Sequence, residues 1–194
     1  MLSSFNPAIP RDLAVEANRR IVTQRSHLTG REIPFDPAKV IVSKTDTKGI
    51  ITYANETFLD ISGFTEEELI GAPHSILRHP DMPRTVFKFL WDNLFAGNEV
   101  FAYVLNRAKN GDHYWVFAHV TPTYDRSGKI IAFHSNRRAP QATAVAAIAP
   151  VYASLLEVER KSASPQAALE NGTRALLDFV GGTGMSYAEL IFSL

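Results

Sequence analysis

Residues 100–138 read VFAYVLNRAKNGDHYWVFAHVTPTYDRSGKIIAFHSNRR and contain three runs rich in β-branched and aromatic residues. The runs extend over Val100–Arg107, His113–Thr123 and Ile130–Arg138. They are separated by Asn110-Gly111 and Ser127-Gly128, and dipeptides of this kind favour the tight turns of β-hairpins. The stretch therefore predicts two consecutive hairpins, built from three neighbouring antiparallel strands.

Both faces of these strands are apolar. The run Tyr114-Trp115-Val116-Phe117-Ala118 is apolar at every position, whereas a strand with one solvated face alternates apolar and polar residues. We therefore expect both faces of the sheet to be covered. Helices of the same domain cover one face; the other requires the N-terminal helix, the C-terminal segment or a second subunit.

The preceding residues predict a further hairpin and several helices. A turn signal at Asp46–Gly49 separates the β-type runs Val40–Val42 and Ile50–Tyr53. Two short helices and one longer helix follow: Glu56–Ser62, a segment opened by the capping box Thr65 to Glu68, and Pro83–Phe95. This order predicts an α+β domain around a five-stranded antiparallel sheet.

The predicted sheet domain covers residues 40–139 and is flanked by two segments of different composition. Residues 1–39 combine a predicted amphipathic helix at Asp12–His27 with a proline-containing linker. Residues 140–194 form a C-terminal helical segment: two helices at Ala142–Lys161 and Pro165–Val180, a glycine-rich break, and a last apolar piece at Tyr187–Leu194.

Composition excludes several classes of function. Lys plus Arg number 20 and Asp plus Glu number 20, so no net positive charge draws the chain to nucleic acid. Cysteine is absent, which excludes disulfides, cysteine–zinc sites, thiolate nucleophiles, c-type haem attachment and photochemistry through a flavin–cysteinyl adduct. The first twenty residues carry charges and no apolar signal region, which predicts a cytoplasmic location.

Ala139–Leu156 carries no charge, which raises the possibility of a membrane span. Its alanine-rich composition and Pro150 favour a packed or dimerising helix instead. Val151, Leu155 and Val158 recur at helical spacing and predict an apolar seam. On this basis we expect a homodimer whose contact includes the Ala142–Lys161 helix and the outer sheet face.

A polar cluster of His74, Arg78, His79 and Asp81 precedes the longest predicted helix of the sheet domain. The histidine spacing fits no usual metal site, and no nucleophile motif accompanies the cluster, so we expect neither a metal centre nor an enzyme. On local sequence alone, Arg78 and Asp81 form a surface pair that caps the following helix.

Two residues elsewhere are candidates for a ligand site. Trp91 is a core residue unless a cavity makes it a ligand wall. Asn106 is polar within an apolar strand, and a buried amide there requires hydrogen-bond partners that a cofactor edge supplies.

Several motifs resemble a known family. The stretches GIITYANETF (49–58), SGF (62–64) and ELIG (68–71) resemble the first half of a PAS sensor domain. The blocks GAPH (71–74), RHPDMP (78–83) and KNGDHYWV (109–116) resemble, more specifically, the PAS domains of aerotaxis transducers. Members of that family are flavin-binding redox sensors that report energy state or oxygen to the chemotaxis machinery, and the resemblance covers roughly residues 41–139.

The resemblance implies a PAS fold with short helices on one face of the sheet, enclosing FAD without a covalent bond. Matching positions imply a cofactor site made of Asn55, Arg78, His79, Asp81 and Asn106, with Trp91 packed beside them. Arginine and histidine there suit a pyrophosphate or an anionic reduced flavin, and an asparagine suits the amide-like ring edge. The implied partner is a chemotaxis receptor or a histidine-kinase signalling protein.

Two positions depart from the family pattern. Flavin-binding transducers carry tryptophan where this chain has Val100, which predicts open space beside the ring. Transducers also continue into a membrane anchor and a long coiled coil, whereas about 55 residues follow Arg138, so we expect the signal to pass to another protein. Two alternatives stay open: a haem-binding PAS gas sensor with His79, His119 or His134 as axial ligand, and a cofactor-free PAS dimerisation adaptor.

Overall fold

A computed structural model describes residues 27–194, so the helix predicted over Asp12–His27 lies outside the described residues except for its last one. Five strands form one antiparallel sheet in the spatial order β2-β1-β5-β4-β3. The strands are β1 (Ile41–Asp46), β2 (Ile51–Ala54), β3 (Val100–Arg107), β4 (His113–Tyr124) and β5 (Ile130–Arg138). The helices are α2 (Glu56–Ser62), α3 (Glu66–Leu69), the 3-10 helix η1 (His74–Leu77), α4 (Arg84–Phe95), α5 (Ala142–Lys161), α6 (Pro165–Gly182) and α7 (Tyr187–Ser193).

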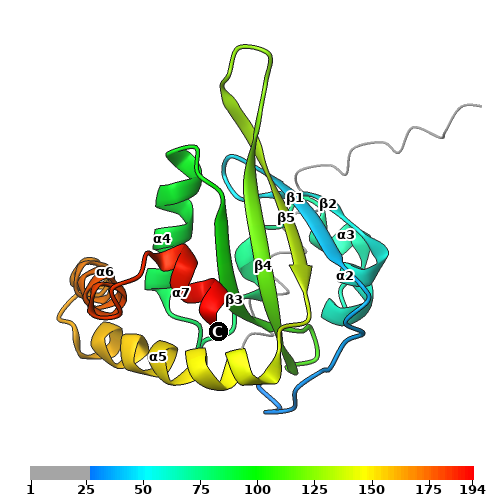
Figure 1. The fold of residues 1–194 in the computed structure, drawn as a ribbon. Helices are drawn as coiled ribbons and strands as arrows, with labels where there is room; N and C mark the ends of the chain where they lie inside the picture. Colours follow the sequence, from blue (N-terminus) through cyan, green and yellow to red (C-terminus); the bar gives the residue numbers. More distant parts are fainter. Residues whose placement is uncertain (1–26) are drawn as a thin grey trace, which may run out of the picture.

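The predicted α+β architecture with a five-stranded antiparallel sheet is confirmed (Figure 1). The three strands of residues 100–138 and both hairpins occur where the sequence places them. Thr65 and Glu68 form the predicted capping box of α3. Helix α6 continues to Gly182, because the glycines that were expected to end it adopt helical geometry.

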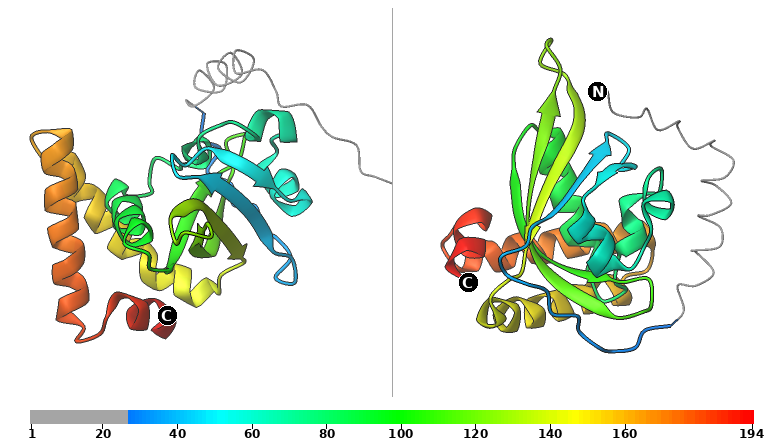
Figure 2. Two further views of the ribbon diagram at one scale, coloured as in Figure 1. Left: turned by 90° about the horizontal axis from the view of Figure 1, so that it is seen from above. Right: turned by 90° about the vertical axis from the view of Figure 1, so that its right-hand side faces the viewer.

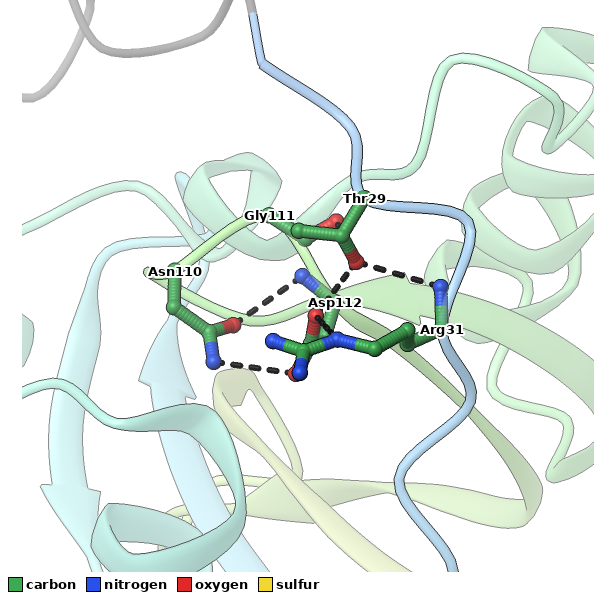
Figure 3. A network of polar contacts seen from close by, with 5 residues as sticks. All are labelled: Thr29, Arg31, Asn110, Gly111 and Asp112. Atoms are coloured by element: carbon green, nitrogen blue, oxygen red, sulfur yellow. Dashed lines mark hydrogen bonds and ion pairs between the residues drawn. The ribbon is translucent and has the colours of Figure 1, made fainter.

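The turn between β3 and β4 anchors the segment that enters the domain from the N-terminal side. Gly111 has a φ of +91°, and a Cβ there would overlap the carbonyl oxygen of His27. Figure 3 shows Asp112 at the centre of this contact: it accepts hydrogen bonds from Thr29 Oγ1 and from Arg31 Nε, the latter at 3.2 Å. The KNGD motif therefore fastens residues 29–31 to the sheet.

Helices α2, α3, η1 and α4 cover the inner face of the sheet and complete the main core (Figures 1 and 2). Inward-facing side chains such as Val104, Val116 and Tyr114 are at least nine-tenths buried. Residues of the same strands that face outward include Tyr103 and Trp115, which belong to a second packed layer.

The C-terminal segment covers the outer face of the sheet. The sequence had left three alternatives for this cover: the N-terminal helix, the C-terminal segment or a second subunit. The Tyr152 hydroxyl of α5 donates to the Tyr103 carbonyl of edge strand β3 at 2.7 Å. The rings of Phe192 and Phe101 lie 4.6 Å apart, so α7 packs on the same face. Because this chain buries the face itself, the burial argument for a homodimer through it does not hold. Homodimerisation stays a prediction.

Helix α5 is long and apolar enough to cross a membrane by length and composition alone. Here its apolar face lies in the core rather than outside it. The buried residues of α5 are Ala144, Ile148, Tyr152, Leu155 and Leu156. The structure thus shows the packed helix that its alanine-rich sequence favours.

Helix α6 returns on the other side of edge strand β3 and lies beside α4 (Figure 2). The α5–α6 hairpin therefore wraps around this edge, with α5 against the outer sheet face and α6 against the helix that covers the inner face. Such coverage protects the exposed edge of a sheet from pairing with other strands.

Candidate functional site

A cavity of about 150 Å³ lies between the inner sheet face and α4. Strands β1, β3, β4 and β5 form its floor, α4 forms one wall, and the segment that contains η1 forms its mouth. The lining residues are Ser43, Thr45, His74, Ser75, Arg78, Phe87, Leu90, Trp91, Leu94, Val104, Asn106, Ala118, Val120, Phe133, Ser135 and Arg137.

Aromatic and aliphatic side chains form one part of the lining. Trp91 packs edge-on against Phe133 with ring centroids 5.3 Å apart. Phe87 lies under the Arg78 guanidinium, whose carbon is 4.8 Å from the ring centroid. These side chains provide the apolar walls that a planar aromatic ligand requires.

The polar part of the lining contains donors without protein acceptors. Asn106 is 3% exposed, and its Nδ2 has no hydrogen-bond partner among the described residues. The same holds for Nε of Arg137 within the described part of the chain. Buried donors left unsatisfied destabilise a protein, and an acceptor placed in this cavity would satisfy both of them.

Arg137 places a buried positive charge in this lining. Its Nη2 donates to Ser43 Oγ at 2.5 Å, and its guanidinium carbon lies 4.4 Å from the Phe58 ring centroid. No ion pair within residues 27–194 joins it to a carboxylate. Burial lowers the pKa of Arg137 to about 10, with a smaller opposing effect from Tyr114. An anionic or electron-rich ligand would stabilise this cation.

His74 lies next to Arg137, with its Nε2 3.4 Å from Nη1. Burial, and to a lesser extent the Arg137 charge, lowers the pKa of His74 to about 3. Its imidazole is therefore neutral at physiological pH. A neutral ring stacked on Phe58 adds no second positive charge to the cavity.

Acidification is expected to destabilise the fold through His74. Its folded pKa is about 3 and its ordinary value 6.5, so the unfolded chain takes up the proton first as the pH falls below 6.5. Below pH 6.5 the free energy of unfolding therefore falls by about 1.4 kcal/mol per pH unit, and the total decrease at pH 5 is about 2 kcal/mol. Urea unfolding at pH 7 and pH 5 gives the free energy of unfolding of wild type and of His74→Gln. The contribution of His74 is the amount by which the difference between the two proteins changes from pH 7 to pH 5.

His119→Gln, on the outer sheet face, is the matched control. The two His variants should differ from each other in the pH dependence of the free energy of unfolding. Identical pH slopes for wild type and His74→Gln would show that His74 does not titrate on unfolding as inferred.

Of the residues implied by the resemblance, Arg78, Trp91 and Asn106 line the cavity, whereas Asn55, His79 and Asp81 do not. The structure brings the first group together from the η1–α4 connection, α4 and β3. The cofactor site itself stays a prediction.

Asn55 caps α2 instead of facing the cavity. Its Oδ1 accepts from the Phe58 amide at 3.2 Å and the Val42 amide at 2.9 Å. Its Nδ2 donates to the Val40 carbonyl at 2.8 Å. All these bonds are to the backbone, so the role of Asn55 is to join α2 to β1.

His79 and Asp81 support the segment after η1 from outside the cavity. His79 is buried; its Nδ1 accepts from the Asp81 amide at 3.1 Å, and its ring packs edge-on against His113. Burial is the main cause that lowers the pKa of His79. Asp81 is exposed and pairs with Arg160 at 3.2 Å. The surface pair expected between Arg78 and Asp81 is therefore replaced by one between Arg160 and Asp81.

Val100 does not leave open space. It is 4% exposed and packs in a cluster with Leu90, Leu94, Val120 and Phe133. It is absent from the cavity lining. Side chains of α4, β4 and β5 occupy the space around Val100, and these same neighbours line the cavity. The effect of Val100 on a ring contact stays a prediction.

The histidines considered as haem ligands all lie outside the cavity lining. His119 bonds to Glu99 on the outer sheet face at 2.7 Å, and His134 contacts Asn136 at 3.2 Å. His79 is oriented by Asp81 as described above. None of these imidazoles is placed to coordinate an iron within the cavity.

The sequence analysis missed Arg137 as a site residue and left His74 without a ligand role. For Arg137 a signal existed: the alternation of β5 places it on the same face as Phe133 and Ser135, which is the apolar inner face. An arginine at an inward position of a covered sheet is rare enough to indicate a function.

Comparison with known proteins agrees with this architecture. A family described as the PAS fold matches residues 51–137. The chain is 40% identical over 134 residues to the aerotaxis receptor of Escherichia coli (strain K12), which covers 69% of this chain and 26% of the receptor. It is 23% identical over 143 residues to blue-light-activated histidine kinase 1 of Erythrobacter litoralis (strain HTCC2594), covering 65% of this chain and 40% of the kinase.

Solved structures show the same fold. The light-state LOV domain of the blue-light photoreceptor Aureochrome1 superposes with a TM-score of 0.52 at 18% identity, covering 62% of this chain and 94% of that domain. A light-oxygen-voltage domain studied with a flavin analogue superposes with a TM-score of 0.51 at 18% identity, covering 58% of this chain and 84% of that domain.

Residues 51–137 have the PAS fold. Within that class, the chain is similar in sequence to the aerotaxis receptor. It spans about a quarter of the length of the Escherichia coli receptor.

Proposed function

We propose that this chain is a non-enzymatic, cytoplasmic PAS sensor module that binds FAD without a covalent bond. It reports redox state or oxygen to a chemotaxis receptor or a histidine-kinase signalling protein. Its similarity to the aerotaxis receptor and to light-oxygen-voltage domains supports this assignment. The cavity supports it independently, as a fold alone does not define a ligand.

The observation that carries the proposal is the pair of buried donors in an aromatic-walled cavity, Asn106 Nδ2 and Arg137 Nε. A flavin ring is apolar at one end and presents carbonyl and nitrogen acceptors at the other. Asn106 would donate to that polar edge, and Trp91 would pack against the ring. A bound flavin supplies reversible electron uptake, and the Arg137 charge would stabilise the negative charge that accompanies it.

A hollow at the mouth of the cavity supports a dinucleotide. Ser75 and Arg78 line both this hollow and the cavity, and Pro80 and Arg107 are the other described residues that line the hollow. Arginine is the side chain best suited to bind phosphate oxygens, because its planar donors match them in pairs. Arg78 and Arg107 would therefore hold the pyrophosphate while the ring occupies the cavity.

The absorbance spectrum of the purified chain, before and after chemical reduction, tests this proposal. FAD gives a band near about 450 nm that bleaches on reduction, and mass spectrometry of the released compound separates FAD from FMN. An intense band near about 400 nm would indicate haem instead. A chain that binds no flavin, even after incubation with excess FAD, would favour the cofactor-free adaptor.

Asn106→Leu is expected to weaken FAD binding about tenfold, because it removes one donor to the ring while preserving side-chain size. Asn136→Leu, on the outer face of β5, is the control. Titration of flavin-free protein, followed by flavin fluorescence, gives both dissociation constants. Equal affinities in the two variants would exclude Asn106 from the ring contact.

A further inference from the structure

Helix α4, which forms the wall of the cavity, begins without a cap of its own. Pro83 occupies the N-cap position and makes no side-chain cap hydrogen bond, and the first turn carries no acidic residue. The first amides of a helix require acceptors, and a negative charge there is stabilised by the helix dipole.

Glu159, near the end of α5, supplies these acceptors. Its Oε2 accepts from the Arg84 amide at 3.1 Å. Its Oε1 accepts from both the amide and the hydroxyl of Thr85, each at 2.7 Å. One carboxylate of the C-terminal segment thus caps the wall helix.

Helix α6 closes this contact from the opposite side. A Cβ at Gly172 would overlap Thr85 Oγ1 and lie 3.4 Å from Cγ of Glu159. Thr85 itself is fully buried. The N-terminus of α4 therefore lies in direct contact with α6 and with Glu159 near the end of α5. Figure 2 shows α4 beside the hairpin that α5 and α6 form.

The cavity is small for a flavin. A cavity of about 150 Å³ holds a single aromatic ring, whereas a flavin has a larger fused ring system. Four of the lining side chains, Phe87, Leu90, Trp91 and Leu94, are on α4. The strands of the floor are hydrogen-bonded to one another, edge strand β3 on one side and β1, β4 and β5 on both, so α4 is the element that can move outward, and α6 lies in its path.

We propose that Glu159 is a positioning residue that holds α4 in its inward position and thereby opposes flavin binding. This inference rests on the proposed flavin function. Filling the cavity moves α4 outward, breaks the Glu159 contacts and shifts the α5–α6 hairpin. The hairpin is thus the element through which occupancy of the cavity is communicated. Because such coupling is reciprocal, removing the Glu159 contacts to α4 must raise the affinity for flavin.

Titration of the flavin-free full chain with FAD tests this inference. Glu159→Ala is expected to bind FAD about tenfold more tightly than wild type, since it removes charge-assisted hydrogen bonds that binding would otherwise break. Glu159→Gln keeps one amide oxygen as an acceptor and should give an intermediate affinity. A residue that merely stabilised the fold would weaken binding when replaced.

Glu157→Ala is the matched control, because Glu157 is exposed and its ion pair within the described part of the chain is with Lys161 on the same helix. Tyr152→Phe removes the hydrogen bond between α5 and β3 and leaves the contacts of α4 unchanged. This variant therefore shows any general effect of a less stable hairpin on the affinity for FAD. Hydrogen exchange provides a second measurement: FAD should increase exchange at the Arg84 and Thr85 amides in wild type.

The outcomes separate the two proposals. If neither wild type nor any variant binds flavin, the proposed function is wrong and the inference is wrong with it. Flavin binding by wild type, with equal or weaker binding by Glu159→Ala, overturns the inference alone. Protection of the Thr85 amide on FAD binding would also overturn it, because it would mean that the cap strengthens.

Discussion

Exchanging Arg137 for methionine is expected to weaken FAD binding by about 10- to 100-fold, the effect of losing a charge-assisted hydrogen bond in a buried site. The same exchange should leave the ligand-free chain at least as stable as wild type. Among residues 27–194 this buried cation has no carboxylate partner, and burial lowers its pKa to about 10. A well-packed apolar side chain of similar length avoids that desolvation cost.

The Ser43 hydroxyl loses its guanidinium donor in this variant, so the double variant Ser43→Ala and Arg137→Met isolates the effect of the charge. Arg138→Met, exposed and on the opposite face of β5, is the control. Urea unfolding gives stability and FAD titration gives affinity. An Arg137→Met chain with wild-type affinity would mean that the buried cation serves the fold and not the ligand.

Val100→Trp is expected to lower the free energy of unfolding by about 3 kcal/mol or more, because it inserts a large ring into a packed cluster. Val100 is surrounded by Leu94, Val120 and Phe133 and is nearly inaccessible. Val100 does not itself line the cavity, and its neighbours Leu94, Val120 and Phe133 separate it from that space. Thermal and urea unfolding measure the loss.

Ile131→Trp is the control for Val100→Trp, since Ile131 is 48% exposed and its strand tolerates aromatic residues. Its stability should stay within about 0.5 kcal/mol of wild type. A stable Val100→Trp chain that binds FAD more tightly than wild type would instead show that this position adjoins the ring.

Local signals in the sequence were sufficient for most of the fold. The turns at Asn110-Gly111 and Ser127-Gly128 predict both hairpins, because their backbone geometry is encoded by the residues themselves. The capping box at Thr65 marks the start of α3 for the same reason. The apolar residues on both faces of β4 predict that both faces of the sheet are covered.

The site was only partly predictable. The resemblance identifies Arg78, Trp91 and Asn106, which do line the cavity, but it does not separate them from Asn55, which caps α2. Motif residues that bind a ligand and motif residues that hold the backbone carry the same sequence signal. Arg137 lacked such a motif and became evident only from its burial and its inward position on β5.

The sequence by itself determined the order of strands and helices, the turns that join them and the PAS class, because each depends on residues close together in the chain. Only the tertiary structure decided that α5 and α7 cover the outer face, that Val100 is fully packed, and that Glu159 caps α4. These contacts join segments far apart in the chain, and an acceptor such as Glu159 is equally suited to solvent or to any free helix end. Which partner it meets depends on how the helices pack around the edge of the sheet, and no local pattern records that.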